Sequence, residues 1–269
     1  MGLDPRLHAL RDGQEIFSGA DWQIASAIAN VHRAPDAGSM QLTQALMGER
    51  VTVFEARTGW AWVKLARDGY VGFIDFGALT ETTSTPTHRV SVPQTYFYTG
   101  PNIKSQPVAT LTMNALVTVD AADEKFARLA DGRCIFAKHL KPVDEVETDF
   151  VAVAQRFLHV PYFWGGKSAL GLDCSGLCQL ALEATGTACP RDSDMQENAL
   201  GSALLVNDLD GLKRGDLVFW DGHVGIMADG ENLLHANGHF MQVTLEPLRG
   251  AVERIGKAHG NVTSVKRLA

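Results

Sequence analysis

The residues best suited to chemistry in this sequence are Cys174, His223 and His235. Cys174 lies in the stretch LDCSGLCQLALEATG, which predicts a helix that begins at the cysteine. At the first turn of a helix, unpaired backbone N–H groups and the helix dipole favour a thiolate and lower the pKa of the thiol. The same N–H groups are suited to stabilise an oxyanion when the thiolate attacks a carbonyl. Cys174 is therefore a candidate nucleophile.

A cysteine nucleophile needs a base that accepts its proton and later protonates the leaving amine. His223 opens the predicted strand HVGIM after a WDG turn, where its ring can project from the edge of a sheet. His235, in the next predicted strand, could bind the far nitrogen of His223 and orient it. A buried cysteine or a strand histidine taken singly is more often structural than catalytic. The surrounding sequence motifs must therefore distinguish between these two roles.

The pattern after residue 147 predicts an α+β domain that positions these side chains. In TDFVAVAQRFLHV, apolar residues recur at helical spacing behind Thr148, the expected N-cap. The stretch SDMQENALG predicts another helix, with Ser193 and Gln196 matching a capping box. Further on, GDLVFW, HVGIMAD, NLLHAN and FMQVTLE predict antiparallel strands joined by tight turns. Helices followed by such a sheet form an α+β unit.

Two similar segments, residues 27–82 and 88–144, precede that domain. Each contains short alternating β runs broken by Gly or Asp-Gly, which is typical of a small all-β barrel. The polar stretch TETTSTPT links them. The expected organisation is an N-terminal extension over residues 1–26, two small barrels, and the α+β domain over residues 148–269.

The composition and net charge of the chain exclude some classes of binding partner. The chain has 269 residues, of which 45% are hydrophobic and 20% charged, as in soluble proteins of two or three modules. A net charge of -7 argues against a general binder of nucleic acid or of an anionic membrane, because both need a basic surface. No apolar run is long enough for a signal sequence or a membrane span. We expect a cytoplasmic protein, unless a leader has been removed.

The cysteines do not predict a disulfide framework in a chain of this length. We expect free thiols, with Cys134, Cys178 and Cys189 serving as packing residues. A zinc enzyme that uses Cys174, Cys178 and His223 is disfavoured, because thiols at i and i+4 do not complete a recognised ligand set. No metal or cofactor is expected.

Six motifs occur in order between Pro161 and Ala236: PYFWGG, LDCSGL, RDS, RGDLVFW, HVGI and LLHA. Together they closely resemble the NlpC family of bacterial cell-wall cysteine peptidases, which have a compact papain-like fold. The two preceding segments resemble bacterial SH3-like domains, small barrels often attached to cell-wall enzymes. The resemblance implies a Cys–His–His triad at Cys174, His223 and His235.

The domain order resembles the branch of this family that recycles murein peptides. Such enzymes are dipeptidyl-peptidases that cleave γ-D-glutamyl–L-diamino acid bonds in peptides with a free N-terminal L-alanine. The resemblance implies that Tyr162 and Trp164 line the site. It also implies that Asp173 and Ser175 hold the γ-D-glutamyl portion of the substrate. Asp192 and Ser193 are implied to lie at the amino end of the substrate.

These pairs also have structural interpretations. Asp173 could be only the N-cap of the helix of the nucleophile, and Asp192 and Ser193 could cap the helix that follows them. A carboxylate at Asp192 would nevertheless suit a free amine, and a cap and a ligand contact can coexist. Tyr162 and Trp164 could pack in a Gly-rich turn instead of lining the site.

The resemblance also implies that the first SH3-like module closes the far end of the groove. Trp60, Trp62 and Tyr70 are aromatic candidates for that wall, although such residues more often form the core of their own barrel. Asn237 and His239 lie close to His235 in sequence and are interpreted as structural.

Two other functions stay open. A binding module with an inactive third domain would be expected to lack Cys174 or His223, and both are present. A related amidase or acyltransferase with the same nucleophile is harder to exclude, because substrate choice depends on side-chain geometry that spacing does not give. The leading interpretation is a peptidase whose partner is a murein-derived peptide.

Overall fold

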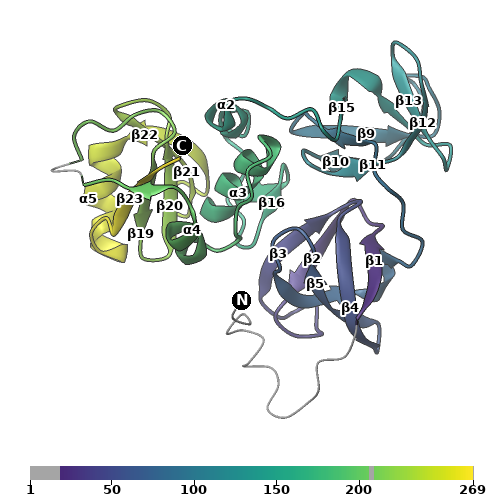
Figure 1. The fold of residues 1–269 in the computed structure, drawn as a ribbon, viewed down its shortest axis with the longest axis horizontal. Helices are drawn as coiled ribbons and strands as arrows, with labels where there is room; N and C mark the ends of the chain where they lie inside the picture. Colours follow the sequence, from purple (N-terminus) through teal and green to yellow (C-terminus); the bar gives the residue numbers. More distant parts are fainter. Residues whose placement is uncertain (1–18, 206–208, 269) are drawn as a thin grey trace.

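The chain folds into two small β domains followed by an α+β domain (Figure 1). This computed structural model describes residues 19–205 and 209–268. Most of the expected N-terminal extension lies outside these residues, but β1 (Ala20–Ile24) pairs with β4 and β7 of the first β domain. The domain therefore begins before residue 27, because Ile24 is buried in its core.

A seven-stranded sheet in the order β3-β2-β6-β5-β4-β1-β7 forms the first β domain. Its strands alternate between core and surface, as Val51 and Val53 of β4 show. A 3-10 turn, η1 (Phe76–Ala78), precedes the last strand. The other strands of this sheet are β2 (Ile28–His32), β3 (Gln41–Leu46), β4 (Arg50–Arg57), β5 (Trp60–Leu65), β6 (Val71–Asp75) and β7 (Leu79–Thr80).

The second β domain contains a five-stranded sheet, β10-β9-β14-β13-β12, and a three-stranded sheet, β11-β8-β15. Its core includes Phe97, Leu111 and Ile135 and continues into Leu46 and Met47 of the first β domain. The two β domains therefore share buried apolar surface. The elements are β8 (His88–Val90), β9 (Gln94–Tyr98), β10 (Pro107–Thr112), β11 (Leu116–Val117), β12 (Val119–Ala122), β13 (Phe126–Leu129), β14 (Cys134–Phe136), η2 (Ala137–His139) and β15 (Leu140–Pro142).

The α+β domain is built on a six-stranded sheet in the order β18-β23-β19-β20-β21-β22. Alternate residues of β19 (Leu217–Trp220) face opposite sides of this sheet: Phe219 packs in the cluster that contains α3 (Cys174–Ala184), and Trp220 packs in the cluster that contains α5 (Leu248–His259). The sheet thus lies between two helical layers, which confirms the α+β class.

The remaining elements of this domain are short. They are α2 (Phe150–Gln155), β16 (Lys167–Ser168), β17 (Gly171–Leu172), α4 (Ser193–Ala199), β18 (Ser202–Ala203), β20 (His223–Met227), β21 (Asn232–Asn237), β22 (Gln242–Pro247) and β23 (Ser264–Arg267).

Two helix starts differ from the sequence-based expectation. The N-cap of α2 is Asp149 and not Thr148, because the Asp149 carboxylate accepts the backbone N–H of Ala152 at 3.0 Å. The capping box expected at α4 is also wrong. The Gln196 side chain instead donates to the carbonyls of Ser175 and Pro190, so tertiary partners replace the local one.

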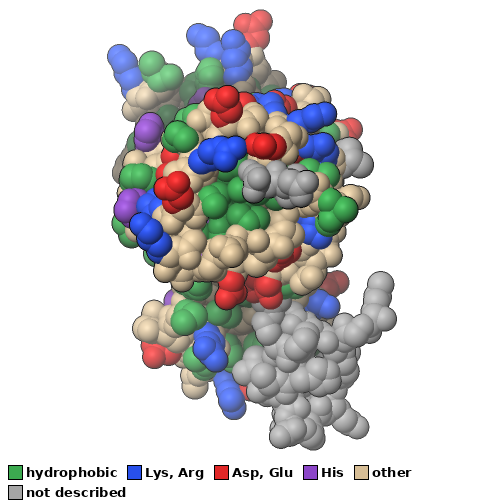
Figure 2. Space-filling view, turned by 90° about the vertical axis from the view of Figure 1, so that its left-hand side faces the viewer, with side chains coloured by type: hydrophobic (Ala, Val, Ile, Leu, Met, Phe, Trp, Pro, Cys, Tyr) green, Lys and Arg blue, Asp and Glu red, His purple; other side chains and the backbone are tan. Residues whose placement is uncertain are grey.

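One face of the α+β domain carries charges of both signs. Figure 2, which looks onto the left-hand side of Figure 1, shows acidic and basic side chains interspersed around a patch of hydrophobic ones. This face therefore does not present the single-sign field that steers nucleic acids to a protein. Within residues 19–205 and 209–268, no helix is long and apolar enough to cross a membrane.

Candidate active site

Cys174 is the first residue of α3, as the sequence predicts. Asp173 is the N-cap, and its carboxylate accepts the backbone N–H of Gly176 at 2.7 Å. Helix α3 packs against β20 and β21, so the thiol meets the backbone N–H of Val224 in β20. The fold therefore brings Cys174 to the start of the strand that His223 opens.

His223 and His235 lie on neighbouring strands of the sheet. Nε2 of His223 is 2.8 Å from Nδ1 of His235, and the two rings meet nearly edge to face, with 5.1 Å between centroids. Both side chains are buried. The structure thus contains the contact by which His235 could orient His223, and the second ring nitrogen of His223, Nδ1, remains for a reaction partner.

Burial opposes charge on both reacting groups. It raises the pKa of Cys174 to about 12, with a further rise from Asp173, while the N–H groups of Val224 and Ser175 act in the opposite direction. It also lowers the pKa of His223 to about 3, with smaller effects from the neighbouring His235, His259 and Arg254. The expected lowering of the thiol pKa is wrong because desolvation at this buried helix start outweighs the helix dipole. Thiol and imidazole therefore rest in their neutral forms.

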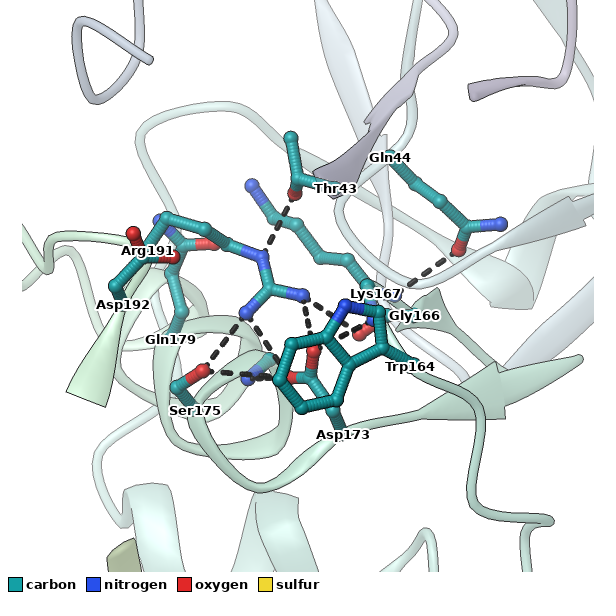
Figure 3. A network of polar contacts seen from close by, with 12 residues as sticks. Thr43, Gln44, Trp164, Gly166, Lys167, Asp173, Ser175, Gln179, Arg191 and Asp192 are labelled. Carbon is teal, nitrogen blue, oxygen red and sulfur yellow. Dashed lines mark hydrogen bonds and ion pairs between the residues drawn. The ribbon is translucent and has the colours of Figure 1, made fainter. Parts of the chain in front are cut away.

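A buried arginine contacts the residues on either side of the nucleophile. Figure 3 shows the Arg191 guanidinium directed at Asp173, Ser175 and Thr43. It contacts both carboxylate oxygens of Asp173, at 2.9 and 2.7 Å, and donates to the hydroxyls of Ser175 at 2.8 Å and Thr43 at 2.7 Å. Arg191 is only 1% exposed. Asp173 is thus the expected N-cap, and it also anchors the cation that links α3 to the first β domain.

Asp192 follows this arginine and points toward the first β domain. The hydroxyl of Tyr70 lies 3.2 Å from each oxygen of its carboxylate. Asp192 holds the N-cap position of α4, but its side chain makes no capping hydrogen bond there. Ser193 is the first residue of that helix and is partly buried. The alternative that the Asp192 carboxylate caps α4 is therefore wrong, because this carboxylate contacts the hydroxyl of Tyr70 instead.

The three aromatic wall candidates of the first β domain differ in their contacts. Tyr70 reaches Asp192, as described above. Trp60 packs edge to face on His32, and Trp62 packs on Phe54, in both cases within the domain. Tyr70 thus makes a contact in the site region.

Tyr162 and Trp164 lie in the loop before β16. Burial raises the pKa of the Tyr162 hydroxyl, and the neighbouring Cys174 and Asp173 raise it further, which places the phenol near the nucleophile. The side chain of Trp164 is 60% exposed, so the alternative that Trp164 packs in a core is wrong. Its carbonyl accepts a hydrogen bond from the Gln41 side chain of the first β domain at 3.3 Å.

Sequence reasoning missed a carboxylate behind the histidine pair. Nε2 of His235 is 2.7 Å from Oε1 of Glu246 in β22, and Arg254 in α5 contacts the same oxygen. Glu246 could be found only from the register of β22 on β21. Asn237 is structural, as expected: its amide donates to Thr244 at 2.7 Å.

The remaining cysteines are Cys134, Cys178 and Cys189. All four are free and buried. Cys189 shares a hydrogen bond with Cys178, and this contact, followed by burial, raises its pKa. In the part of the chain that the structure describes, no group of three His, Cys, Asp or Glu residues is arranged to hold a metal ion.

Comparison with known families agrees with this geometry. Residues 159–254, which include the cysteine and both histidines, match the NlpC/P60 family. The C-terminal domain is an NlpC/P60 domain. Residues 31–79 match the family described as the bacterial dipeptidyl-peptidase SH3 domain, which identifies the first β domain. The SH3-like character of the second β domain stays a prediction.

Several relatives match most of the chain. The gamma-D-glutamyl-L-lysine dipeptidyl-peptidase of Bacillus subtilis (strain 168) is 29% identical over 215 residues, which cover 72% of this chain and 71% of the relative. Dipeptidyl-peptidase 6 of Lysinibacillus sphaericus is 26% identical over 237 residues, with 80% and 86% covered. These relatives and the NlpC/P60 domain make this protein a cysteine peptidase.

A solved structure shows the same fold over nearly the whole chain. The NlpC/P60 family protein from Bacillus cereus ATCC 10987 superimposes with a TM-score of 0.77 and 22% sequence identity. The match covers 92% of this chain and 99% of the other. The overall fold is therefore shared with that protein.

Proposed function

We propose that this protein hydrolyses the γ-D-glutamyl–L-diamino acid bond of murein peptides that carry a free N-terminal L-alanine. Relatives named as γ-D-glutamyl-L-lysine dipeptidyl-peptidases support the bond and the dipeptide product. The observation that carries the end-group requirement is the Asp192 carboxylate held beside Tyr70. A partly buried carboxylate with a hydroxyl neighbour suits an ammonium group.

A buried ion pair joins the chain segments that carry this carboxylate and the nucleophile. Asp192 and Cys174 are the chain neighbours of Arg191 and Asp173, which are paired through a buried salt bridge of 2.7 Å. In the proposed complex the α-amino group binds at Asp192, the γ-D-glutamyl carbonyl lies at the thiol, and the diamino acid is the leaving group. Ser193, Tyr162 and Trp164 are the proposed walls, and Ser175 and Asp173 support the γ-D-glutamyl end.

The proposed reaction uses the neutral Cys174–His223 pair. The thiol proton passes to His223 as the sulfur attacks the γ-carbonyl carbon, and N–H groups at the start of α3 stabilise the oxyanion. The C–N bond then breaks, and the amine leaves with the proton from His223. A water molecule gives its proton to His223 and attacks the thioester, which releases L-Ala-D-Glu and restores the thiol.

Mass spectrometry of peptide digests tests the proposal. L-Ala-γ-D-Glu-L-Lys and its diaminopimelate analogue should each yield the dipeptide and the free diamino acid, and Cys174→Ala should abolish turnover. Cys134→Ala, which removes a buried thiol in the second β domain, is the matched control and should remain active. Substantial hydrolysis by Cys174→Ala would contradict the nucleophile.

The end-group requirement has a separate test. N-acetylated peptide should be cleaved at least about 10-fold more slowly than free peptide, the equivalent of about 1.4 kcal/mol in lost binding of the amine. Equal rates for blocked and free peptides would show an endopeptidase instead. We also propose a cytoplasmic location, supported by the four free cysteines, and cell fractionation would test it.

A further inference from the structure

His235 is held at both of its ring nitrogens. Nδ1 faces Nε2 of His223 at 2.8 Å, and Nε2 faces Oε1 of Glu246 at 2.7 Å. The His235 side chain is fully buried, so solvent cannot replace either partner. A neutral imidazole has one N–H donor and one acceptor nitrogen, and the neighbours therefore decide which nitrogen carries the proton.

The charge state of Glu246 determines this choice. Burial acts to raise the pKa of Glu246, but the hydrogen bond from His235 and the charge of Arg254 outweigh it, and the pKa lies below its usual value. An ionised carboxylate only accepts hydrogen bonds, so Nε2 of His235 must donate. Burial lowers the pKa of His235 and keeps it neutral, which leaves its Nδ1 as an acceptor.

The same reasoning extends to His223. Because Nδ1 of His235 accepts, Nε2 of His223 must carry a proton and donate to it. His223 is neutral, so its Nδ1 has no proton and holds a free lone pair. A lone pair at Nδ1 is what a base needs to take a proton from a thiol, whereas the opposite tautomer would present an N–H there.

We propose that Glu246, held by Arg254, is a positioning residue that fixes the tautomers of both histidines and so leaves Nδ1 of His223 as the base. This inference rests on the proposed roles of Cys174 and His223. It also gives the imidazolium of His223 a compensating charge, because its Nε2 proton is linked through His235 to a carboxylate. Glu246 touches neither the thiol nor the substrate in this scheme.

Arg254 contacts the same carboxylate oxygen of Glu246 that faces His235. It lies on α5, the helix that directly follows the strand of Glu246, and its guanidinium also lies 5.3 Å from the centre of the Phe240 ring. Together with the hydrogen bond from His235, the charge of Arg254 lowers the pKa of Glu246 against the effect of burial. A carboxylate without this cation would be freer to protonate and could then donate to His235 in the wrong direction.

Nitrogen-15 NMR of the histidine rings tests the proposal directly, because the ring shifts distinguish the two neutral tautomers. In the wild-type protein His223 and His235 should both be Nε2–H tautomers. In Glu246→Ala, His223 should shift partly or fully to the Nδ1–H tautomer. The value of kcat should fall about 10-fold to 100-fold, as for other residues that orient a functional histidine, and KM should change little.

The pH profile supplies a second readout. Titratable and charged groups around the histidine pair are Glu246 on β22 and Arg254 and His259 on α5. Cys174 on α3 meets the backbone N–H of Val224, the residue after His223. Loss of the carboxylate removes a negative charge that favours the imidazolium, so the acid limb of kcat/KM should move to lower pH in Glu246→Gln. The amide oxygen can still accept from His235, so this variant should retain more activity than Glu246→Ala.

Exposed residues of α5 provide matched controls. Glu253→Ala and Arg249→Ala alter an exposed carboxylate and an exposed, ion-paired arginine and should leave tautomers and acid limb unchanged. Arg254→Ala should reproduce the Glu246→Ala effects in weaker form. The inference is overturned if folded Glu246→Ala keeps wild-type tautomers and an unshifted acid limb, even when kcat falls. Activity in Cys174→Ala would instead overturn the proposed function and leave the NMR result standing.

Discussion

The two β domains contact the NlpC/P60 domain with different chemistry. The first contributes charged and polar side chains: Arg67 pairs with Glu183 at 2.8 Å, and Asp68 accepts from Gln179 at 2.8 Å. The second contributes Asn114, whose amide donates to a carbonyl of α3 at 3.0 Å, together with apolar packing. The first interface thus pairs charged side chains with each other, whereas the second adds to its apolar packing hydrogen bonds to backbone carbonyls, including one from Arg156 to Ser91.

The two interfaces also differ in what they reach. The first β domain contacts Arg191, Asp192 and the loop before the nucleophile, through Thr43, Tyr70 and Gln41. The second contacts the carbonyl of Leu180 in the far half of α3, and its Thr112 hydroxyl accepts the backbone N–H of Ala169 between β16 and β17. We infer that the first β domain shapes the site, whereas the second mainly supports the helix that carries the nucleophile.

Among variants at the two interfaces, Arg191→Ala is expected to cause the largest loss of stability. The change leaves the buried Asp173 carboxylate without its cation, so the free energy of unfolding should fall by about 3–5 kcal/mol. Arg156→Ala is the matched control, because Arg156 donates to Ser91 of the second β domain and its side chain is 37% exposed. It should cost less than about 1 kcal/mol. Equal losses in denaturant unfolding would remove the distinction between the interfaces.

A smaller effect is expected from Asn114→Ala in the second interface. The change leaves the Leu180 carbonyl without its buried donor, which should cost about 1–3 kcal/mol of stability. KM and kcat at a temperature where the variant is folded should stay at wild-type values. A raised KM for the tripeptide would show that the second β domain also shapes the site.

The smallest effect on stability is expected from Tyr70→Phe. It removes the hydroxyl beside Asp192 but keeps the ring, so the KM for peptides with a free amine should rise by about 5-fold to 10-fold, the value of one hydrogen bond of about 1 kcal/mol. Cleavage of N-acetylated peptide should not change further. Tyr96→Phe, which alters a tyrosine of the second β domain that is 43% exposed, is the control. Steady-state kinetics that show equal KM values for both variants would argue against Asp192 as the amine site.

Local sequence signals determined much of this protein. Short alternating runs predicted the β domains, and helical spacing with Asp173 in front predicted α3 with Cys174 at its start. Motif order added the two histidines, which the sheet places 2.8 Å apart. These features depend on periodicity and on neighbours within a few residues, which a sequence displays directly.

Tertiary structure alone decided the partners of those residues. The contact of Glu246 with His235 depends on strand register, and the contacts of Tyr70 and Arg191 join segments from different domains. Burial reversed the expected direction of the Cys174 pKa, because the cost of desolvating a thiolate depends on how completely the other elements cover the helix start. Register, domain packing and burial are properties of the folded chain, and no spacing of residue types encodes them locally.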